Sequence, residues 1–448
     1  MLITSNNFHV LGIETSCDDT GVSIIGSDGQ VLSNCTHSQL KRHIDHGGII
    51  PMVAKEYHVD NIDNVARKAF QESDLGSFRD HIHAVAVTTR PGLEHSLQVG
   101  IDYAKQLSRK YSKPLIPIHH MQAHALMPLL EHRQIRFPYL ALLISGGHCL
   151  ISICKRYNQF DLLGTSLDNA PGELLDKIAR RCRLKNLGPP FDCVSGGAAI
   201  ELLSRRPNAD RFKYFNDGTC LPMAGHCGCD MSFAGYRGSF DDLVPTIDDV
   251  WRGGDREKLL DELGHLCGSI QRVMLIQIVK KLQRAIGYYR MFWRHQNSSL
   301  FEDDPHVQES IGYRVRSMDE SDSLDLVISG GVAANSYIVE GIRSACLEID
   351  EEMRVFAPSK DLCSDNGLMV AWNGLLRYKD YLSDKKKFDK IPLDENVINE
   401  SEDIDIIQAQ PESPIGQDIR EKVSMARFPL ARLRNPELKM REKVVSPN

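Results

Sequence analysis

The sequence contains no uninterrupted apolar run of the ~18 residues that a membrane-spanning helix needs. It also lacks the C-x2-C pairs of zinc modules, and no pattern typical of a signal peptide is present. Twelve cysteines are scattered without a regular frame, so we expect reduced thiols rather than disulfides. A zinc site formed by Cys220, His226, Cys227 and Cys229 is the less favoured alternative.

Two common nucleotide-binding patterns are absent as well. Neither G-x4-G-K-[ST] nor G-x-G-x-x-G occurs, so the sequence supports neither a P-loop nor a Rossmann site. Positive charge is also scarce, because 53 Lys and Arg against 60 Asp and Glu leave a formal net charge of −7. This excludes a protein that coats nucleic acid with its whole surface, and any RNA contact must come from a local basic patch.

The chain is nevertheless typical of a folded protein with more than one domain. Hydrophobic residues make up 42% and charged residues 25%, which is ordinary for globular proteins. Its 448 residues predict two or three domains.

The first part of the chain has the pattern of three short strands followed by alternating helices and strands. Turn residues and β-rich runs predict strands over 8–13, 21–25, 31–34, 84–88 and 115–118. Apolar residues at helical spacing predict helices over 53–70 and 97–107.

The same order of elements then begins again. We predict strands over 139–144, 149–154, 326–328 and 355–357, with a further strand around 162–163. Helices are predicted over 172–183, 256–286 and 366–376, and from about residue 334. Because both halves open with a strand, a polar turn and a returning strand, the sequence predicts a two-lobed α/β duplicate.

We therefore expect an N-terminal lobe over 8–135 and a C-terminal lobe over 136–378 with a polar insertion near 297–323. A polar tail follows over 379–448. The basic residues of this tail predict a solvated or disordered end, with an arm that contacts nucleic acid as the alternative.

Three polar turns follow strands in this pattern, at 14–20, 145–147 and 329–331. The second and third read Ser-Gly-Gly, and glycine lets backbone N–H groups approach a phosphate without a Cβ clash. A helix start after the third turn adds positive dipole. Together the turns resemble those of the actin, hexokinase and heat-shock-chaperone class of folds, which implies an active site in the cleft between the lobes.

His120 and His124 form a second feature, His-Met-Gln-Ala-His. On a helix they would lie one turn apart on the same face, where two imidazoles can bind one metal ion. Asp365 is the best candidate for a third ligand. The alternatives are that the histidines are polar surface or capping residues and that Asp365 caps a helix. The motif is not H-E-x-x-H, so a zinc protease would lack its general base.

These stretches together closely resemble the tRNA N6-adenosine threonylcarbamoyltransferase family, formerly described as O-sialoglycoprotein endopeptidases. The matching stretches lie at 11–20, 117–124, 142–148, 166–177, 329–335, 364–367 and 427–430. The form of the histidine motif and the segment 140–201 resemble the bacterial and mitochondrial branch. The resemblance therefore implies a mitochondrial protein, although residues 1–9 contain no arginine and do not resemble a transit peptide.

The resemblance implies one divalent metal ion of the Fe, Zn or Mg type, held by His120, His124 and Asp365. It also implies the substrate-binding positions Leu143, Ile144, Ser145, Gly146, Gly147, Asp176, Gly197, Glu201 and Asn335. Gly197 and Glu201 follow from matching residues 193–198 to the family's Pro-Gly-Gly-Pro segment. No catalytic side chain is assigned beyond the metal site.

The implied reaction transfers the threonylcarbamoyl group of threonylcarbamoyl-AMP to N6 of adenosine 37 in tRNAs that read codons beginning with A, and releases AMP. A separate synthase would supply the donor, and we expect a homodimer. The main alternative is an ATP-dependent small-molecule kinase of the same fold class. Such a kinase would need neither His120 nor His124. A metallopeptidase and a nucleotide-binding scaffold are further alternatives.

Overall fold

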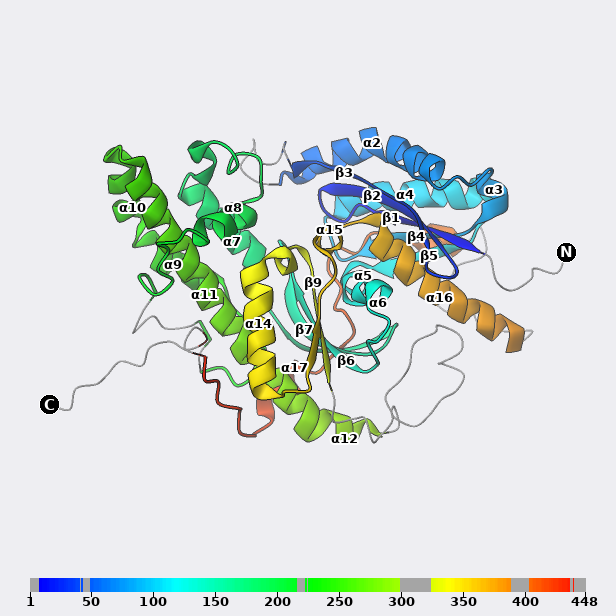
Figure 1. Cartoon of the computed structure of the whole chain (residues 1–448). Coiled ribbons are helices and arrows are strands. Elements are labelled where there is room, and N and C mark those ends of the chain that lie inside the picture. The colour runs from blue at the N-terminus through cyan, green and yellow to red at the C-terminus, as the bar shows by residue number, and fades with distance from the viewer. Residues whose placement is uncertain are drawn as a thin grey trace.

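The computed structural model describes residues 8–40, 42, 49–215, 222–223, 225–298, 324–387, 403–435 and 438. Most of the predicted insertion near 297–323 lies outside these residues. Two β-sheets lie side by side, with helices on the outer faces and further helices between the sheets (Figure 1). The predicted α/β architecture is confirmed.

The first sheet has the strand order β3-β2-β1-β4-β5. Its strands are β1 (His9–Glu14), β2 (Asp19–Gly26), β3 (Val31–Ser38), β4 (Ile82–Arg90) and β5 (Leu115–His119). The first three strands are antiparallel neighbours, and β4 and β5 run parallel to β1. One face is covered by α2 (Pro51–Glu72) and α4 (Glu94–Tyr111), and α3 (Phe78–His81) leads into β4.

The second sheet has the order β10-β9-β6-β7-β8-β11. Its strands are β6 (Tyr139–Ile144), β7 (Cys149–Arg156), β8 (Gln159–Thr165), β9 (Asp325–Ser329), β10 (Arg354–Phe356) and β11 (Gln417–Asp418). Taken in the order β8-β7-β6-β9-β10, its strands have the same relative directions as β3-β2-β1-β4-β5 of the first sheet. The repeat confirms the two-lobed duplicate of the actin, hexokinase and heat-shock-chaperone class.

Alternating residues of β6 face two different cores, as the period of a strand requires. Leu140, Leu142 and Ile144 pack with the outer helices α7 (Pro171–Arg181), α8 (Gly196–Ser204), α11 (Arg256–Tyr288) and α14 (Ser336–Ile349). Residues 139, 141 and 143 pack with α5 (His120–Leu126) and α16 (Gly367–Lys387). The other face of the first sheet contributes to this same core, so α5 and α16 lie between the sheets.

The remaining helices are short or lie at the periphery. They are α6 (Pro128–Glu131), η1 (Leu184–Leu187), α9 (Ala234–Asp241), α10 (Val244–Arg252), η2 (Tyr289–Trp293), α12 (Arg294–Gln296), η4 (Gly331–Ala334), α15 (Lys360–Cys363), η5 (Asp403–Ile406) and α17 (Arg420–Met425). Among the described residues, no helix has both the length and the apolar character needed to cross a membrane.

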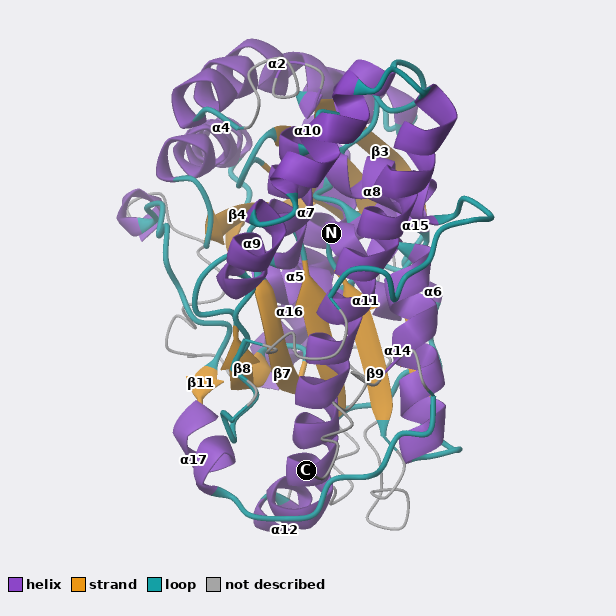
Figure 2. Cartoon of the chain, turned by 90° about the vertical axis from the view of Figure 1, so that its left-hand side faces the viewer, coloured by secondary structure: helices purple, strands orange, loops and turns teal. Residues whose placement is uncertain are grey.

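Residues 403–435, which we call the C-terminal strap, pack on both lobes. Ile404 and Ile407 enter the core beneath α2 and α4, and Ile415 enters the core between the sheets. Further on, β11 extends the second sheet and α17 follows it (Figure 2). Single apolar residues therefore anchor this polar segment. The basic run that begins at Arg420 was expected to be solvated or disordered, but its residue Val423 is also buried. The predicted domain boundaries at 135 and 378 stay predictions.

Candidate metal centre and substrate site

The histidine motif begins where β5 ends and α5 starts. His119 caps this helix, because its Nδ1 accepts a hydrogen bond from the N–H of Met121 at 3.2 Å. His120 and His124 then project from one face of α5, and their ring centroids lie 4.7 Å apart. Both side chains are buried, which contradicts the alternative that they are polar surface residues.

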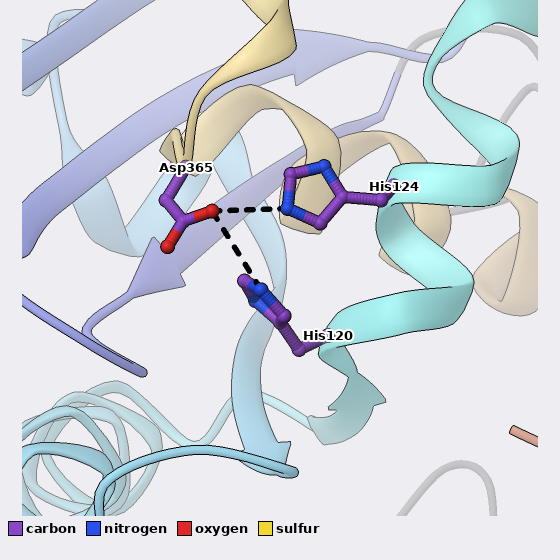
Figure 3. Close-up of side chains that lie close together, drawn as sticks. All are labelled: His120, His124 and Asp365. Atoms are coloured by element: carbon purple, nitrogen blue, oxygen red, sulfur yellow. Dashed lines mark hydrogen bonds and ion pairs between the residues drawn. The ribbon is translucent and has the colours of Figure 1, made fainter. Parts of the chain in front are cut away.

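Asp365 lies just before α16 and faces the two histidines (Figure 3). Its Oδ1 lies 2.9 Å from Nε2 of His124 and 3.6 Å from Nε2 of His120. The cap of α16 is Asn366, whose Oδ1 accepts a hydrogen bond from the N–H of Met369 at 2.9 Å. The capping alternative for Asp365 is therefore wrong, because its neighbour performs that task.

The three side chains interact strongly even without a cation. Burial disfavours the charged form of the Asp365 carboxyl group. The neighbouring His120 and His124 outweigh this effect and hold the pKa of Asp365 well below its ordinary value. Burial likewise opposes protonation of His120, yet Asp365 and Glu14 raise its pKa to about 9. Since both carboxylates favour positive charge at this point, the site is electrostatically suited to a cation.

The donor set also fits a divalent metal ion. One ligand atom from each of the three side chains can be chosen so that all lie within 4.8 Å of one another. Two imidazoles and one carboxylate are a ligand set of iron and zinc sites that leave positions open. Nδ1 of His124 is buried with no hydrogen-bond partner within the described chain. No other group of three such ligands occurs among the described residues.

The alternative zinc site near Cys227 gains no support from the described residues. Cys227 is exposed and Cys229 is buried, while Cys220 lies outside the described residues. The cysteines in the described ranges are all free thiols.

Glu14 is a member of this site that the sequence analysis did not single out. Its carboxylate is fully buried at the end of β1, where it accepts hydrogen bonds from the Ser16 N–H and the Thr88 hydroxyl. Nδ1 of His120 lies 3.3 Å from its Oε2 and 3.0 Å from the hydroxyl oxygen of Ser16. Such partners fix the tautomer of a metal-binding histidine and leave its other nitrogen for the ion.

We therefore expect Glu14→Gln to weaken metal binding about 10- to 100-fold, because the amide no longer attracts the imidazole N–H as a carboxylate does. A chelator competition titration with Zn²⁺ measures the change. The control is Glu94→Gln, at an exposed carboxylate in the first turn of α4. Equal affinities for both variants would contradict this role of Glu14.

The three polar turns converge on this region. The first contributes Ser16, as described above. The second, at 145–148, brings the ring of His148 to 6.4 Å from that of His120. In the third, Gly330 has a φ of 97°, and a Cβ there would lie 2.5 Å from the carbonyl oxygen of Ile144. Burial and the neighbouring His120 lower the pKa of His148 to about 4, so it is neutral at pH 7.

In the second turn, residues 145–147, which we call the Ser145 turn, the two glycines are the exposed residues. The N–H of Ser145 donates to the carbonyl of His148 at 2.8 Å, so it is already occupied. Gly146 and Gly147 are exposed, and a Cβ at either position would meet no atom within 4 Å. Leu143 and Ile144 lie buried in β6. Of this segment, the N–H groups of the glycines can therefore best face a ligand.

The other predicted substrate positions form two pairs. The carboxylate of Asp176 on α7 lies against the N–H groups of Gly196 and Gly197 at the start of α8. Glu201 accepts a hydrogen bond from the N–H of Ser336 at 2.9 Å, next to Asn335. Asn335 itself caps α14 and donates to Oε1 of Gln271 at 2.7 Å. The pairing follows from the packing of α7, α8 and α14 on the second sheet.

The chain is similar in sequence to known proteins of one family. Residues 30–372 match the model of the family described as TsaD, tRNA N6-adenosine threonylcarbamoyltransferase. The mitochondrial tRNA N6-adenosine threonylcarbamoyltransferase of Xenopus tropicalis is 38% identical, over 82% of this chain and 82% of that protein. Those of Rattus norvegicus and Homo sapiens are 35% and 34% identical, over 95% and 98% of this chain and 91% and 94% of theirs.

Among solved structures, an activator of 2-hydroxyisocaproyl-CoA dehydratase from Clostridium difficile aligns with 86% of this chain and all of its own, at 13% identity and a TM-score of 0.43. The transferases named above are more than 30% identical to this chain over most of its length, and this similarity establishes its family. It belongs to the tRNA N6-adenosine threonylcarbamoyltransferase family, in its mitochondrial branch.

Proposed function

We propose that this protein transfers the threonylcarbamoyl group of threonylcarbamoyl-AMP to N6 of adenosine 37 in mitochondrial tRNAs that read codons beginning with A. The observation that carries the proposal is the joint position of His120, His124 and Asp365 beside the Ser145 turn, in a chain of this family. One divalent metal ion of the Fe, Zn or Mg type, held by those three side chains, would act as a Lewis acid on an oxygen of the donor.

The reaction needs no covalent intermediate with the protein. The lone pair of the N6 amine attacks the carbamoyl carbon, the bond from this carbon to the phosphate oxygen breaks, and AMP leaves with the bonding electrons. The amine loses one proton to solvent. The N–H groups of Gly146 and Gly147 can stabilise the departing phosphate, because fixed dipoles aimed at developing charge lower the barrier.

The remaining predicted positions would orient the nucleotide half of the donor. Asp176 and Gly197 lie together at one side of the second lobe, and Glu201 and Asn335 lie together at the start of α14. We propose that these two pairs contact the sugar and base of the AMP moiety. The proposal also includes a separate synthase that supplies the donor, and a homodimer.

A reconstitution tests the function. The purified protein, a synthase that makes threonylcarbamoyl-AMP, ATP, threonine and bicarbonate are incubated with a tRNA that carries adenosine next to its anticodon. We expect threonylcarbamoyladenosine by mass spectrometry of the nucleosides, and none with a matched tRNA that carries guanosine there. ATP turnover with a small-molecule acceptor and no modified nucleoside would favour the kinase alternative.

A further inference from the structure

A cavity of about 390 Å³ lies along the second half of α11. Its floor comes from α11 and its walls from a loop and the C-terminal strap, and the lining includes Gln277, Lys280, Lys281, Arg284, residues 225–228 and residues 430–431. We call it the basic cavity. Among its described lining residues are three cations and no Asp or Glu.

The two buried cations of the basic cavity are held by carbonyl oxygens. Nζ of Lys281 lies 3.1 Å from the carbonyl oxygen of His226 and 3.2 Å from that of Gly228. Arg284 donates to the carbonyl oxygens of Val423 and Ala426 in the strap. A carbonyl oxygen carries only a partial negative charge, so the positive charge of the cavity is not neutralised by these contacts.

Two buried polar atoms of the lining have no hydrogen-bond partner in the described part of the chain. One is Oε1 of Gln277, a side chain 2% exposed, and the other is Nε of Arg284, a residue 8% exposed. Buried polar atoms without partners are rare and costly. A ligand that satisfies both must offer an acceptor to the Arg284 N–H and a donor to the Gln277 oxygen.

The RNA backbone offers this combination at every nucleotide. Its phosphate is an anionic acceptor and its ribose 2′-hydroxyl is a donor. The position of the cavity is also suitable, because Gln271 on the same helix accepts a hydrogen bond from the predicted substrate residue Asn335. Lys281 lies about 15 Å further along the same helix, at ~1.5 Å per residue. An RNA whose acceptor base reacts with a donor that Asn335 helps to hold must continue across the neighbouring surface.

We propose that the basic cavity binds the sugar–phosphate backbone of the tRNA, with a phosphate beside Lys280 and Arg284 and a 2′-hydroxyl donating to Gln277 Oε1. This inference rests on the proposed function. Lys280, exposed at the rim, supplies charge, and Gln277 distinguishes ribose from deoxyribose.

The test measures binding of an unmodified tRNA transcript by the full chain at several salt concentrations. We expect Lys280→Ala to raise the Kd about 3- to 10-fold and to reduce the slope of log K against log salt by about 1. Gln277→Met, which keeps the side-chain volume, should reduce the preference for the RNA over DNA of the same sequence. The matched control is Lys258→Ala, an exposed lysine in the first turn of the same helix.

Circular dichroism and the thermal midpoint show whether the variants are folded. If folded Lys280→Ala and Gln277→Met both bind the transcript as the Lys258→Ala control does, the inference is overturned while the transferase function stands. The inference is also overturned if inorganic phosphate raises the thermal midpoint of the wild type but not of Lys280→Ala, while both proteins bind tRNA equally well. The cavity would then hold a small anion. Wild-type protein that fails to bind or modify tRNA would instead contradict the proposed function.

Discussion

Replacing His124 with alanine should lower the rate of tRNA modification by at least about 100-fold, because loss of a direct ligand exceeds the effect of losing an outer partner. The imidazole of His124 is fully buried, and its Nε2 lies 2.9 Å from Asp365. Without it, two ligands remain and the carboxylate loses its nearest partner. Initial rates in the reconstituted reaction and metal content per chain measure the two consequences.

The control for this variant is His132→Ala. His132 is a half-buried imidazole whose Nε2 lies 3.0 Å from the carbonyl oxygen of Ala357, and it is not part of the His120, His124 and Asp365 group. It should leave both the rate and the metal content close to those of the wild type. A His124→Ala protein that retains full metal content and full rate would show that these side chains are not the metal site.

Gly12→Ala should unfold the protein or destabilise it by about 3 kcal/mol or more, since the new methyl group meets backbone that cannot rotate away. A Cβ at Gly12 in β1 would lie 2.2 Å from the backbone nitrogen of Ala371 and 2.5 Å from the carbonyl oxygen of Gly367, both in α16. Gly21 in β2 is equally close to Gly367. The first turn of α16 therefore rests directly on the first sheet.

Because Asp365 immediately precedes this turn, displacement of α16 should also weaken metal binding in any Gly12→Ala protein that folds. Denaturant unfolding and metal content measure the two effects. The matched control is Gly76→Ala, where the nearest atom to a new Cβ is 4.0 Å away. An unfolding free energy for Gly12→Ala equal to that of Gly76→Ala would contradict this account of the packing.

Elements with a strong local pattern could be predicted from the sequence. The strand at 139–144 has the predicted limits, and the helix predicted over 256–286 is observed as Arg256–Tyr288. Long periodic runs report which residues are buried, so they identify such elements well. Helices α8, α9 and α10 were not predicted, since they are short and two of them begin at or near glycine.

The three proposed metal ligands could be predicted from the sequence for different reasons. His120 and His124 share one helical turn, so their proximity is a local property of the chain. Asp365 came from the resemblance and from its chemistry, whereas its orientation depended on Asn366 acting as the cap of α16. Periodicity cannot decide which of two adjacent polar residues caps a helix.

The sequence by itself determined the main strands and the long helices, the duplicate and the residue types of the proposed ligands, because these depend on local patterns and residue types. Only the tertiary structure decided that Glu14 and His148 lie beside His120, and that the C-terminal strap closes one side of the basic cavity. Those contacts join residues far apart in the chain. They form only when two sheets pack around shared helices, and no local pattern specifies which faces meet.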